Sequence, residues 1–277
     1  MPNLHLTSAS GNMSVDLWQV QEDREKSDGF VDATASPSFD SDEAFLSGLT
    51  RQQQSEVTGK ATAIRLSNQA GYSDDPVTAL AEWVQEVMAL INGKQGTGFE
   101  LVHDERGETI NIVLEDFAWT RSAGARFEVD WDMKLRVGEG IMVQEDTAPN
   151  PANPSSSWSL DGDDLHKPIQ YREQKKMQFK PTPIAFASSP EENLQEATSG
   201  ALRTVTISAE YTGPVPERNS FDQTMKGLIG QDQLVTYSSA FPGHELSVMV
   251  NNYESTQEAG ITKHGEYSLE LIEGVSG

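Results

Sequence analysis

The sequence predicts a mainly β protein with α-helices, in the α+β class, built from two tandem β-sandwich or β-barrel modules with one packed helix each. Apolar residues alternate with polar ones along several segments, which is typical of half-buried strands. Helical spacing interrupts these strands twice, and the last part of the chain repeats the pattern of the middle. We therefore expect an extended N-terminal arm at residues 1–58, a first module at 59–145, a connector at 146–199 and a second module at 200–277.

The internal repeat has a constant offset of 136 residues, from Ile110 to Leu246, and needs no gap. The other aligned positions keep apolar, aromatic or small character, and they are Ile112 with Val248, Leu114 with Val250, Phe117 with Tyr253, Ala123 and Gly124 with Ala259 and Gly260, Trp131 with Tyr267, Met133 with Leu269, and Leu135 with Leu271. A fixed period of this kind indicates a duplicated structural unit. We interpret it as a duplicated β-hairpin, which favours a structural role over catalysis.

The clearest helix lies in the first module. Asp74 and Asp75 supply its cap, and Pro76 takes the first helical position. The apolar residues that follow recur at helical spacing and form one stripe, which comprises Val77, Leu80, Val84, Val87, Met88 and Ile91. Asn92 and Gly93 are typical of a helix end.

Strands flank the helix in both modules. In the first module we expect a strand at residues 61–66, a turn at Gly71, a strand at 99–102, a turn at Arg106 and Gly107, and long strands at 109–120 and 126–137 joined through 122–125. In the second module we expect strands at 204–211, 234–237, 246–253 and 267–271, and a short helix capped by Asn219 or Ser220 with Phe221, Met225, Leu228 and Ile229 on its apolar face. The shared order is strand, helix, strand and long hairpin.

The arm and the connector have weaker patterns. Residues 1–58 are rich in Ser, Asp, Gln and Gly, so we expect an extended arm that orders against a neighbouring subunit, with one short helix at residues 42–49. The connector contains turn signals at residues 149–151 and 153–157. Residues 178–180 and 184–186 are expected to form a hairpin around residues 181–183.

The charge is strongly acidic and evenly spread. The chain has 20 Lys and Arg against 43 Asp and Glu, a formal net charge of −23. Without a basic cluster the chain has no means of binding nucleic acid through its phosphates. In molar salt the Debye length falls to about 3 Å, so self-repulsion is screened while a carboxylate-rich surface stays hydrated. The composition indicates a halophilic protein, with an ordinary acidic protein as the alternative.

The residue inventory excludes several chemistries. The chain has no cysteine, which excludes disulfides, thiolate metal sites and cysteine nucleophiles. The first 16 residues lack a basic region and an apolar run, and no stretch approaches the roughly 18 apolar residues of a membrane span. We expect a soluble chain without a cleaved export signal.

Two short motifs resemble ligand-binding loops. Gly93, Gly96 and Gly98 follow a helix and precede a strand, the reverse of the order that cradles phosphate, so they indicate helix termination. Residues 161–164 (DGDD) next to His166 have ligand types for a hard cation but lack the spacing of a calcium loop. An exposed turn is the favoured interpretation, and any cation there would be a salt cation.

No arrangement in the sequence predicts catalysis. The five histidines, which are His5, His103, His166, His244 and His264, are far apart and form no metal-binding pair, and no serine has the glycines of a nucleophile elbow. Phe117 with Trp131 and Tyr253 with Tyr267 are expected to pack in the core rather than to form a ligand platform. We therefore predict no catalytic, cofactor-binding or metal-binding residues, and a halophilic enzyme with dispersed catalytic residues stays as a minor alternative.

The strand, helix, strand and hairpin order at residues 61–137 and 204–271 resembles the tail-tube fold of tailed viruses and related injection machines. The segments that carry the resemblance most clearly are residues 110–121 (INIVLEDFAWTR), Gly124 and residues 127–133 (FEVDWDM). The match is one of pattern and covers a little over half of the chain; the arm and the connector are unmatched. The family includes tail tubes, distal tail proteins and baseplate hubs.

The resemblance implies a structural virion protein that forms a ring around the channel for the genome. Two modules per chain permit three chains in one pseudo-hexameric ring or six chains in two stacked rings. The implied partners are copies of this chain and other tail and baseplate proteins, with genome DNA passing the acidic wall without specific binding. The implied location is the tail of a virion assembled in host cytoplasm. Together with the acidic composition, the resemblance suggests a virus of a halophilic archaeon. A carbohydrate- or receptor-binding β-sandwich adhesion module is the alternative, and it predicts a concave pocket lined by aromatic residues.

Overall fold

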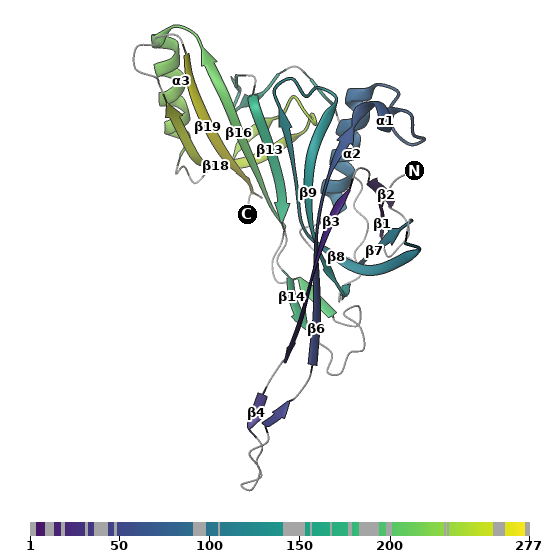
Figure 1. The fold of residues 1–277 in the computed structure, drawn as a ribbon. Helices are drawn as coiled ribbons and strands as arrows, with labels where there is room; N and C mark the ends of the chain where they lie inside the picture. The colour runs from purple at the N-terminus through teal and green to yellow at the C-terminus, as the bar shows by residue number, and fades with distance from the viewer. Residues whose placement is uncertain are drawn as a thin grey trace.

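One large antiparallel sheet dominates the structure and confirms the mainly β, α+β class (Figure 1). The computed structural model describes residues 4–8, 14–17, 20–30, 33–35, 44–46, 49–90, 98–104, 106–140, 153–155, 157–166, 168–176, 179–182, 194–197, 201–229, 231, 233–256 and 264–274. In these ranges the sheet contains 14 strands. A three-stranded and a two-stranded sheet accompany it.

The first module is a four-stranded unit with the order β6-β9-β8-β7 and two helices. Its elements are β6 (Leu49–Thr62), α1 (Ala63–Ser67), α2 (Pro76–Leu90), β7 (Gly98–His103), β8 (Glu108–Ser122) and β9 (Glu128–Val137). Helix α2 begins at Pro76 as predicted, and the Thr78 backbone N–H donates to Asp75 Oδ2 at 2.9 Å. The buried side of α2 packs Trp83 against the rings of Phe117 and Trp131, both at 6.2 Å between centroids. These contacts confirm that Phe117 and Trp131 belong to the core.

The predicted strand at residues 61–66 is wrong beyond Thr62, because residues 63–67 form helix α1. Ala63 and Leu66 are both fully buried, and their spacing of three places them on one helical face. Ile64 lies between them and is 64% exposed. The apolar residues in this short stretch fit the period of a strand as well as that of a helix. The helix forms because it buries Ala63 and Leu66 against the module.

The second module has the same strand order, β16-β19-β18-β17. Its elements are β16 (Leu202–Thr212), α3 (Val215–Leu228), β17 (Val235–Ser238), β18 (Glu245–Thr256) and β19 (His264–Glu273). The cap predicted at Asn219 or Ser220 is wrong, because α3 begins at Val215 and its N-cap is Pro214, five residues before Asn219. Its first turn contains Pro216, and a proline is tolerated there since the first N–H groups of a helix have no intrahelical partner.

The apolar face predicted for the second helix is confirmed in part. Met225 is fully buried, and Phe221 and Leu228 pack against the core. Ile229 lies beyond the end of α3 and is 39% exposed. The predicted aromatic pair of this module is confirmed as core, since Tyr253 and Tyr267 are buried with ring centroids 5.9 Å apart.

The two hairpins share their register residue for residue. In β8 and β9, Leu114 lies opposite Leu135, the register shifts at Glu115, and Phe117 lies opposite Met133. In β18 and β19 the matching positions, each 136 residues later, are Val250 opposite Leu271, a shift at Asn251, and Tyr253 opposite Leu269. The third strands follow the same offset, with Leu101 opposite Ile110 and Tyr237 opposite Leu246. A β-bulge preserved at one position is a specific backbone feature, so the modules are structural copies.

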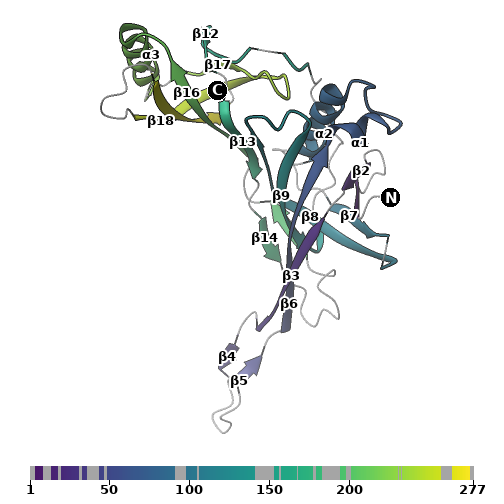
Figure 2. The same cartoon turned by 45° about the horizontal axis from the view of Figure 1, so that its top comes forward.

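Strand β13 (Pro168–Lys176) of the connector joins the two modules into one sheet. One edge pairs with β16 of the second module and the other with β8 of the first. Figures 1 and 2 show the modules side by side, with β13 between them. The short strands β11 (Ser159–Leu160) and β12 (Asp163–Asp164) extend the sheet beyond β17.

The described strands of the N-terminal region belong to the fold. Strands β1 (Leu4–Ser8) and β2 (Ser14–Leu17) extend the sheet beyond β7, and β3 (Gln21–Phe30) pairs with β6 in a long hairpin that projects from the body (Figure 2). Leu4, Leu6, Val15 and Leu17 are at most 2% exposed, so this part of the expected arm is buried against its own chain. Leu4 and Leu6 alternate with polar residues, as do Val15 and Leu17, and this alternation predicts a half-buried strand where we expected an arm. The helix predicted at residues 42–49 is wrong, because β5 (Ala44–Leu46) pairs with β4 (Ala33–Ala35).

A small sheet pairs the end of the first module with two strands of the connector. It has the order β10-β15-β14 and consists of β10 (Glu139–Gly140), β14 (Phe179–Thr182) and β15 (Leu194–Ala197). Pro181 and Thr182 therefore lie in a strand and not in the predicted turn, because residues 194–197 supply the partner strand. Residues 149–151 and 184–186 lie outside the described residues. Within the described ranges no helix is long and apolar enough to cross a membrane.

Candidate functional site at the junction of the two modules

The junction between the modules is the most distinctive site of the molecule. It comprises β13 and the residues of α2, β8, β16 and the turn at 239–244 that contact it. Alternate residues of β13 point to the buried face of the sheet, so Tyr171 and Glu173 enter the core together. Glu173 is fully buried, and Arg203 of β16 is 4% exposed. Charged residues are almost never buried in this way unless they are paired.

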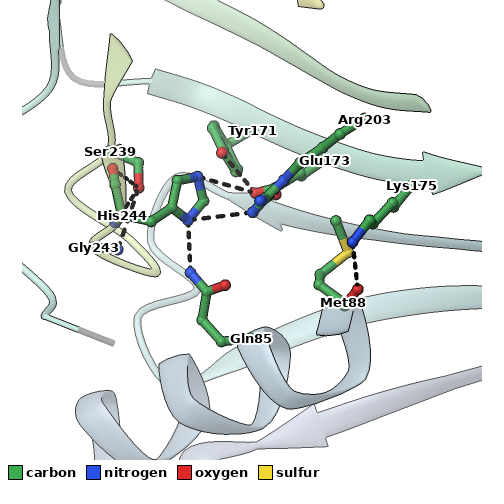
Figure 3. A network of polar contacts seen from close by, with 9 residues as sticks. All are labelled: Gln85, Met88, Tyr171, Glu173, Lys175, Arg203, Ser239, Gly243 and His244. Atoms are coloured by element: carbon green, nitrogen blue, oxygen red, sulfur yellow. Dashed lines mark hydrogen bonds and ion pairs between the residues drawn. The ribbon is translucent and has the colours of Figure 1, made fainter. Parts of the chain in front are cut away.

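The carboxylate of Glu173 is the centre of a polar network (Figure 3). The Arg203 guanidinium donates to one of its oxygens and forms a buried ion pair. The Tyr171 hydroxyl donates to Glu173 Oε2 at 2.9 Å. His244 Nε2 faces the same oxygen at 3.8 Å. Three elements of the connector and the second module therefore converge on one carboxylate.

Helix α2 of the first module closes the network from the other side. Gln85 Nε2 donates to His244 Nδ1 at 2.7 Å, and the same ring nitrogen lies 3.4 Å from Arg203 Nη2. Because Nδ1 accepts these donors, the proton of the neutral imidazole is on Nε2, toward Glu173. Lys175 Nζ donates to the backbone carbonyl of Met88 at 3.1 Å. These contacts fix α2 to β13 and to the second module.

Burial and pairing set the charges in the network. Burial lowers the pKa of His244 to about 4, so the ring is neutral at pH 7. Burial alone would raise the pKa of Glu173, but the charge of Arg203 and the hydrogen bonds from Tyr171 and Arg203 lower it. Burial also lowers the pKa of Lys175 to about 8. The site therefore holds a buried carboxylate and guanidinium that satisfy each other, an arrangement suited to fixing the modules in one geometry.

Aromatic rings fill the rest of the junction. Trp119 of β8 lies 4.9 Å from Tyr171 and 5.5 Å from Phe241, measured between ring centroids. The Trp158 ring also lies 4.9 Å from the Tyr171 ring, with the two planes tilted by 52°. The Arg121 guanidinium lies over the Phe241 ring at 4.1 Å. Since these rings come from both modules and the connector, their packing couples the three parts.

A cavity of about 650 Å³ opens beside these rings. Its lining includes the tip of the β8–β9 hairpin at residues 122–126 and the connector residues Trp158 and Leu165. Tyr171 and Phe241 also border it, but each is only 2% exposed, which leaves Trp158 as the lining aromatic residue with more exposed surface. An adhesion module would bind its ligand in a cavity of this kind.

The sequence motifs lie away from the junction network. Asp161 and Gly162 have φ of 52° and 87° and form the exposed turn between β11 and β12, as predicted for residues 161–164. The His166 ring instead packs among Tyr211, Phe221 and Tyr267, and burial lowers its pKa. In the parts of the chain that the structure describes, no three His, Asp or Glu side chains are placed to hold a metal ion. Residues 93–97 lie outside the described residues.

His5 of β1 and His103 of β7 lie on neighbouring strands, because Leu4 is opposite His103, whereas His244 belongs to the junction. His5 Nδ1 and Nε2 contact Asp16 at 2.5 Å and Asp104 at 2.8 Å, far along the sheet from His244. Although partial burial opposes it, the hydrogen bonds to Asp104 and Asp16 raise the pKa of His5.

From the sequence we named His244 but assigned a junction role to no residue of the network. The segment at 170–176 (QYREQKK) contains only one apolar or aromatic residue, so its alternation was hidden. Glu173 can be recognised as a buried residue only when its ion-pair partner is known, and that partner, Arg203, is 30 residues away in the sequence.

Comparison with known proteins adds no family to these observations. A scan against protein-family models found no match, and a search of curated proteins found no matching relative. The functional argument therefore depends on the geometry of the fold and the junction.

Proposed function

We propose that this chain is a structural protein of a virus tail, where it forms a ring around the channel for the genome. Its place would be the tail tube, the distal tail or the baseplate hub. The observation that carries the proposal is the edge-to-edge union of two copies of one module in a single sheet through β13. A unit that already continues its sheet from one module to the next is suited to continuing it into neighbouring molecules.

The arrangement within the chain favours one of the two stoichiometries. Modules of two stacked rings would lie above one another, with separate sheets. Here they lie side by side, and β13 makes their sheets continuous (Figures 1 and 2). This supports three chains, and therefore six modules, in one pseudo-hexameric ring.

The charge of the chain fits the same role. A net charge of −23 repels phosphates, so a wall of this protein would not hold the passing DNA. Copies with this charge repel each other at low salt and associate once the charge is screened. We propose a virion of a virus of a halophilic archaeon, assembled in host cytoplasm with other tail and baseplate proteins.

The cavity beside Trp158 favours a second candidate function, a carbohydrate- or receptor-binding adhesion module. Such a module would bind an oligosaccharide as a single chain. The ring proposal instead requires assembly, with the cavity as a surface hollow near the hairpin tips.

The mass of the purified protein in molar potassium chloride separates these functions. Light scattering should give three times the chain mass of 30.4 kDa. A single-chain mass at every protein concentration would contradict the ring. Oligosaccharide binding by that single chain, lost on Trp158→Ala, would establish the adhesion module instead.

A further inference from the structure

We propose that β3 of one molecule pairs with residues 252–256 of β18 in a second copy of the chain. In this interface β3 takes the place that β13 takes inside the chain. The inference rests on the proposed ring and specifies the strands and the register that close it.

The acceptor edge lies on β18. In the first module β9 lies on one side of β8, while β7 and then β13 occupy the other side. In the second module β19 lies on one side of β18, and β17 covers the other side at residues 245–248. Among the described strands none pairs with residues 252–256 on that side. The position that β13 fills in the first module is thus open in the second.

Burial shows the same difference between the modules. Asp116 and Ala118 of β8 are 4% and 0% exposed beneath the β13 contact. Their counterparts at an offset of 136, Asn252 and Glu254, are exposed. An unpaired strand edge presents free N–H and C=O groups and accepts another strand readily.

The donor strand is identified by the same duplication. Gly59 of β6 lies opposite Trp131, and Ala209 of β16 lies opposite Tyr267, so β6 and β16 correspond at an offset of 150. Along these strands, β3 pairs with β6 in the first module and β13 pairs with β16 in the second. In the described part of the chain the other edge of β13 pairs with β8, while the other edge of β3 pairs with no strand.

The internal junction also specifies the register. Asp23 lies opposite Glu56, and Arg172 lies opposite Thr206, so Asp23 corresponds to Arg172. Arg172 in turn lies opposite Thr120, whose counterpart is Thr256. The expected backbone pairs between two molecules are Asp23 with Thr256, Arg24 with Ser255, Glu25 with Glu254, Lys26 with Tyr253, and Ser27 with Asn252.

This contact is head to tail, because it joins two different surfaces of identical chains. Contacts of this kind produce a closed ring when the rotation between subunits closes, and an open filament when it does not. If the second junction repeats the rotation of the first, the sheet continues through every module of the ring and both open edges are covered.

Disulfide trapping in the cysteine-free chain tests the register. Two double variants place cysteines at adjacent expected pairs, Asp23→Cys with Thr256→Cys and Arg24→Cys with Ser255→Cys. Adjacent antiparallel pairs alternate between wide and narrow Cα separations, of about 5.5 and 4.5 Å, and both lie in the range of a disulfide. The control Asp23→Cys with Asn252→Cys is four residues out of register, roughly 14 Å along the strand.

Oxidation in molar salt should convert most of a matched variant into linked dimers and trimers, with the control staying at the mass of one chain. Each variant is first shown to be folded and ring-forming under reducing conditions, so misfolding does not imitate a negative result. Rings whose matched cysteines stay unlinked, or link no better than the control, would overturn this interface but leave the proposed function standing. A ladder beyond three chains would overturn the three-chain ring, and a protein without rings would overturn both proposals.

Discussion

At the scale of single residues, the two modules differ at a position that packs against an aromatic ring of the neighbouring strand. Gly59 and Ala209 are equivalent positions, and each lies opposite the aromatic residue of the following hairpin, Trp131 or Tyr267. A Cβ atom on Gly59 would lie 2.4 Å from Trp131 Cζ2, whereas Ala209 accommodates its methyl group beside the smaller Tyr267. The size of the aromatic ring therefore decides which of the two positions is glycine.

Gly59→Ala should destabilise the fold by about 1–3 kcal/mol, the usual cost of overpacking a core. The reverse change at the equivalent position, Ala209→Gly, creates no clash and should cost about 1 kcal/mol or less from backbone entropy. Denaturant unfolding in molar salt measures both free energies. Equal costs for the two variants would show that the Trp131 ring does not restrict position 59.

The buried ion pair of the junction should be much more sensitive than an exposed one. Glu173→Gln leaves the Arg203 guanidinium buried without its counter-ion and should cost about 3–5 kcal/mol of unfolding free energy. Asp132→Asn, which breaks the partly exposed pair with Arg172 at 3.1 Å, is the matched control and should cost about 1 kcal/mol or less. A Glu173→Gln variant as stable as the control would contradict the role of this network in joining the modules.

His244 should make the fold sensitive to mild acid. Its folded-state pKa is about 4, below the ordinary 6.5, so the unfolded chain takes up the proton first. The stability that depends on His244 is therefore complete above pH 6.5 and falls by about 1.4 kcal/mol per pH unit as the pH decreases toward the folded-state pKa. Denaturant midpoints between about pH 6.5 and 5 should show this loss, before the carboxylates titrate extensively.

Two variants isolate the contribution of this histidine. His244→Gln should reduce the slope of the unfolding free energy against pH by up to about 1.4 kcal/mol per pH unit, the contribution of one proton. His5→Gln should leave it unchanged over the same range, because the raised pKa of His5 keeps that ring protonated there in the folded state, and its contribution is lost only as the pH rises. An unchanged slope in His244→Gln would assign the acid sensitivity to another group.

At the scale of elements, some of the fold could be predicted from local signals. The apolar stripe that follows Pro76 predicted α2, and the offset of 136 residues predicted two equivalent hairpins. The structure adds that both hairpins have a β-bulge at the same place, at Glu115 and Asn251. Strand β13 could not be predicted, because its buried Glu173 has meaning only beside Arg203 of another strand. Helix α1 was not predicted, because five residues are too few to distinguish the apolar period of a helix from that of a strand.

Proline substitutions at adjacent positions of β18 should separate folding from assembly. In an antiparallel strand the N–H groups of neighbouring residues point to opposite edges, so one of Glu254 and Ser255 donates toward β19 and the other toward the open edge. Proline at the residue that donates toward β19 should destabilise the fold. Proline at the residue that donates toward the open edge should leave a folded chain that no longer forms rings. Circular dichroism and light scattering distinguish the two results, and two folded, ring-forming variants would exclude this edge from the interface.

At the scale of the whole molecule, the charge sets the conditions for assembly. A chain with a net charge of −23 should associate weakly at 0.1 M salt, where the Debye length is about 10 Å, and strongly in molar salt, where it is about 3 Å. The described sheet ends at one side in β3 and leaves part of β18 open at the other. Screening should therefore allow these two edges to meet without any change of fold.

Electron cryo-microscopy of the protein purified in molar salt tests this account most directly. We expect a closed ring of three chains in which six modules alternate around one channel and one sheet continues through β13 and β3 in turn. Single chains, or two rings with the modules of each chain stacked along the axis, would contradict it.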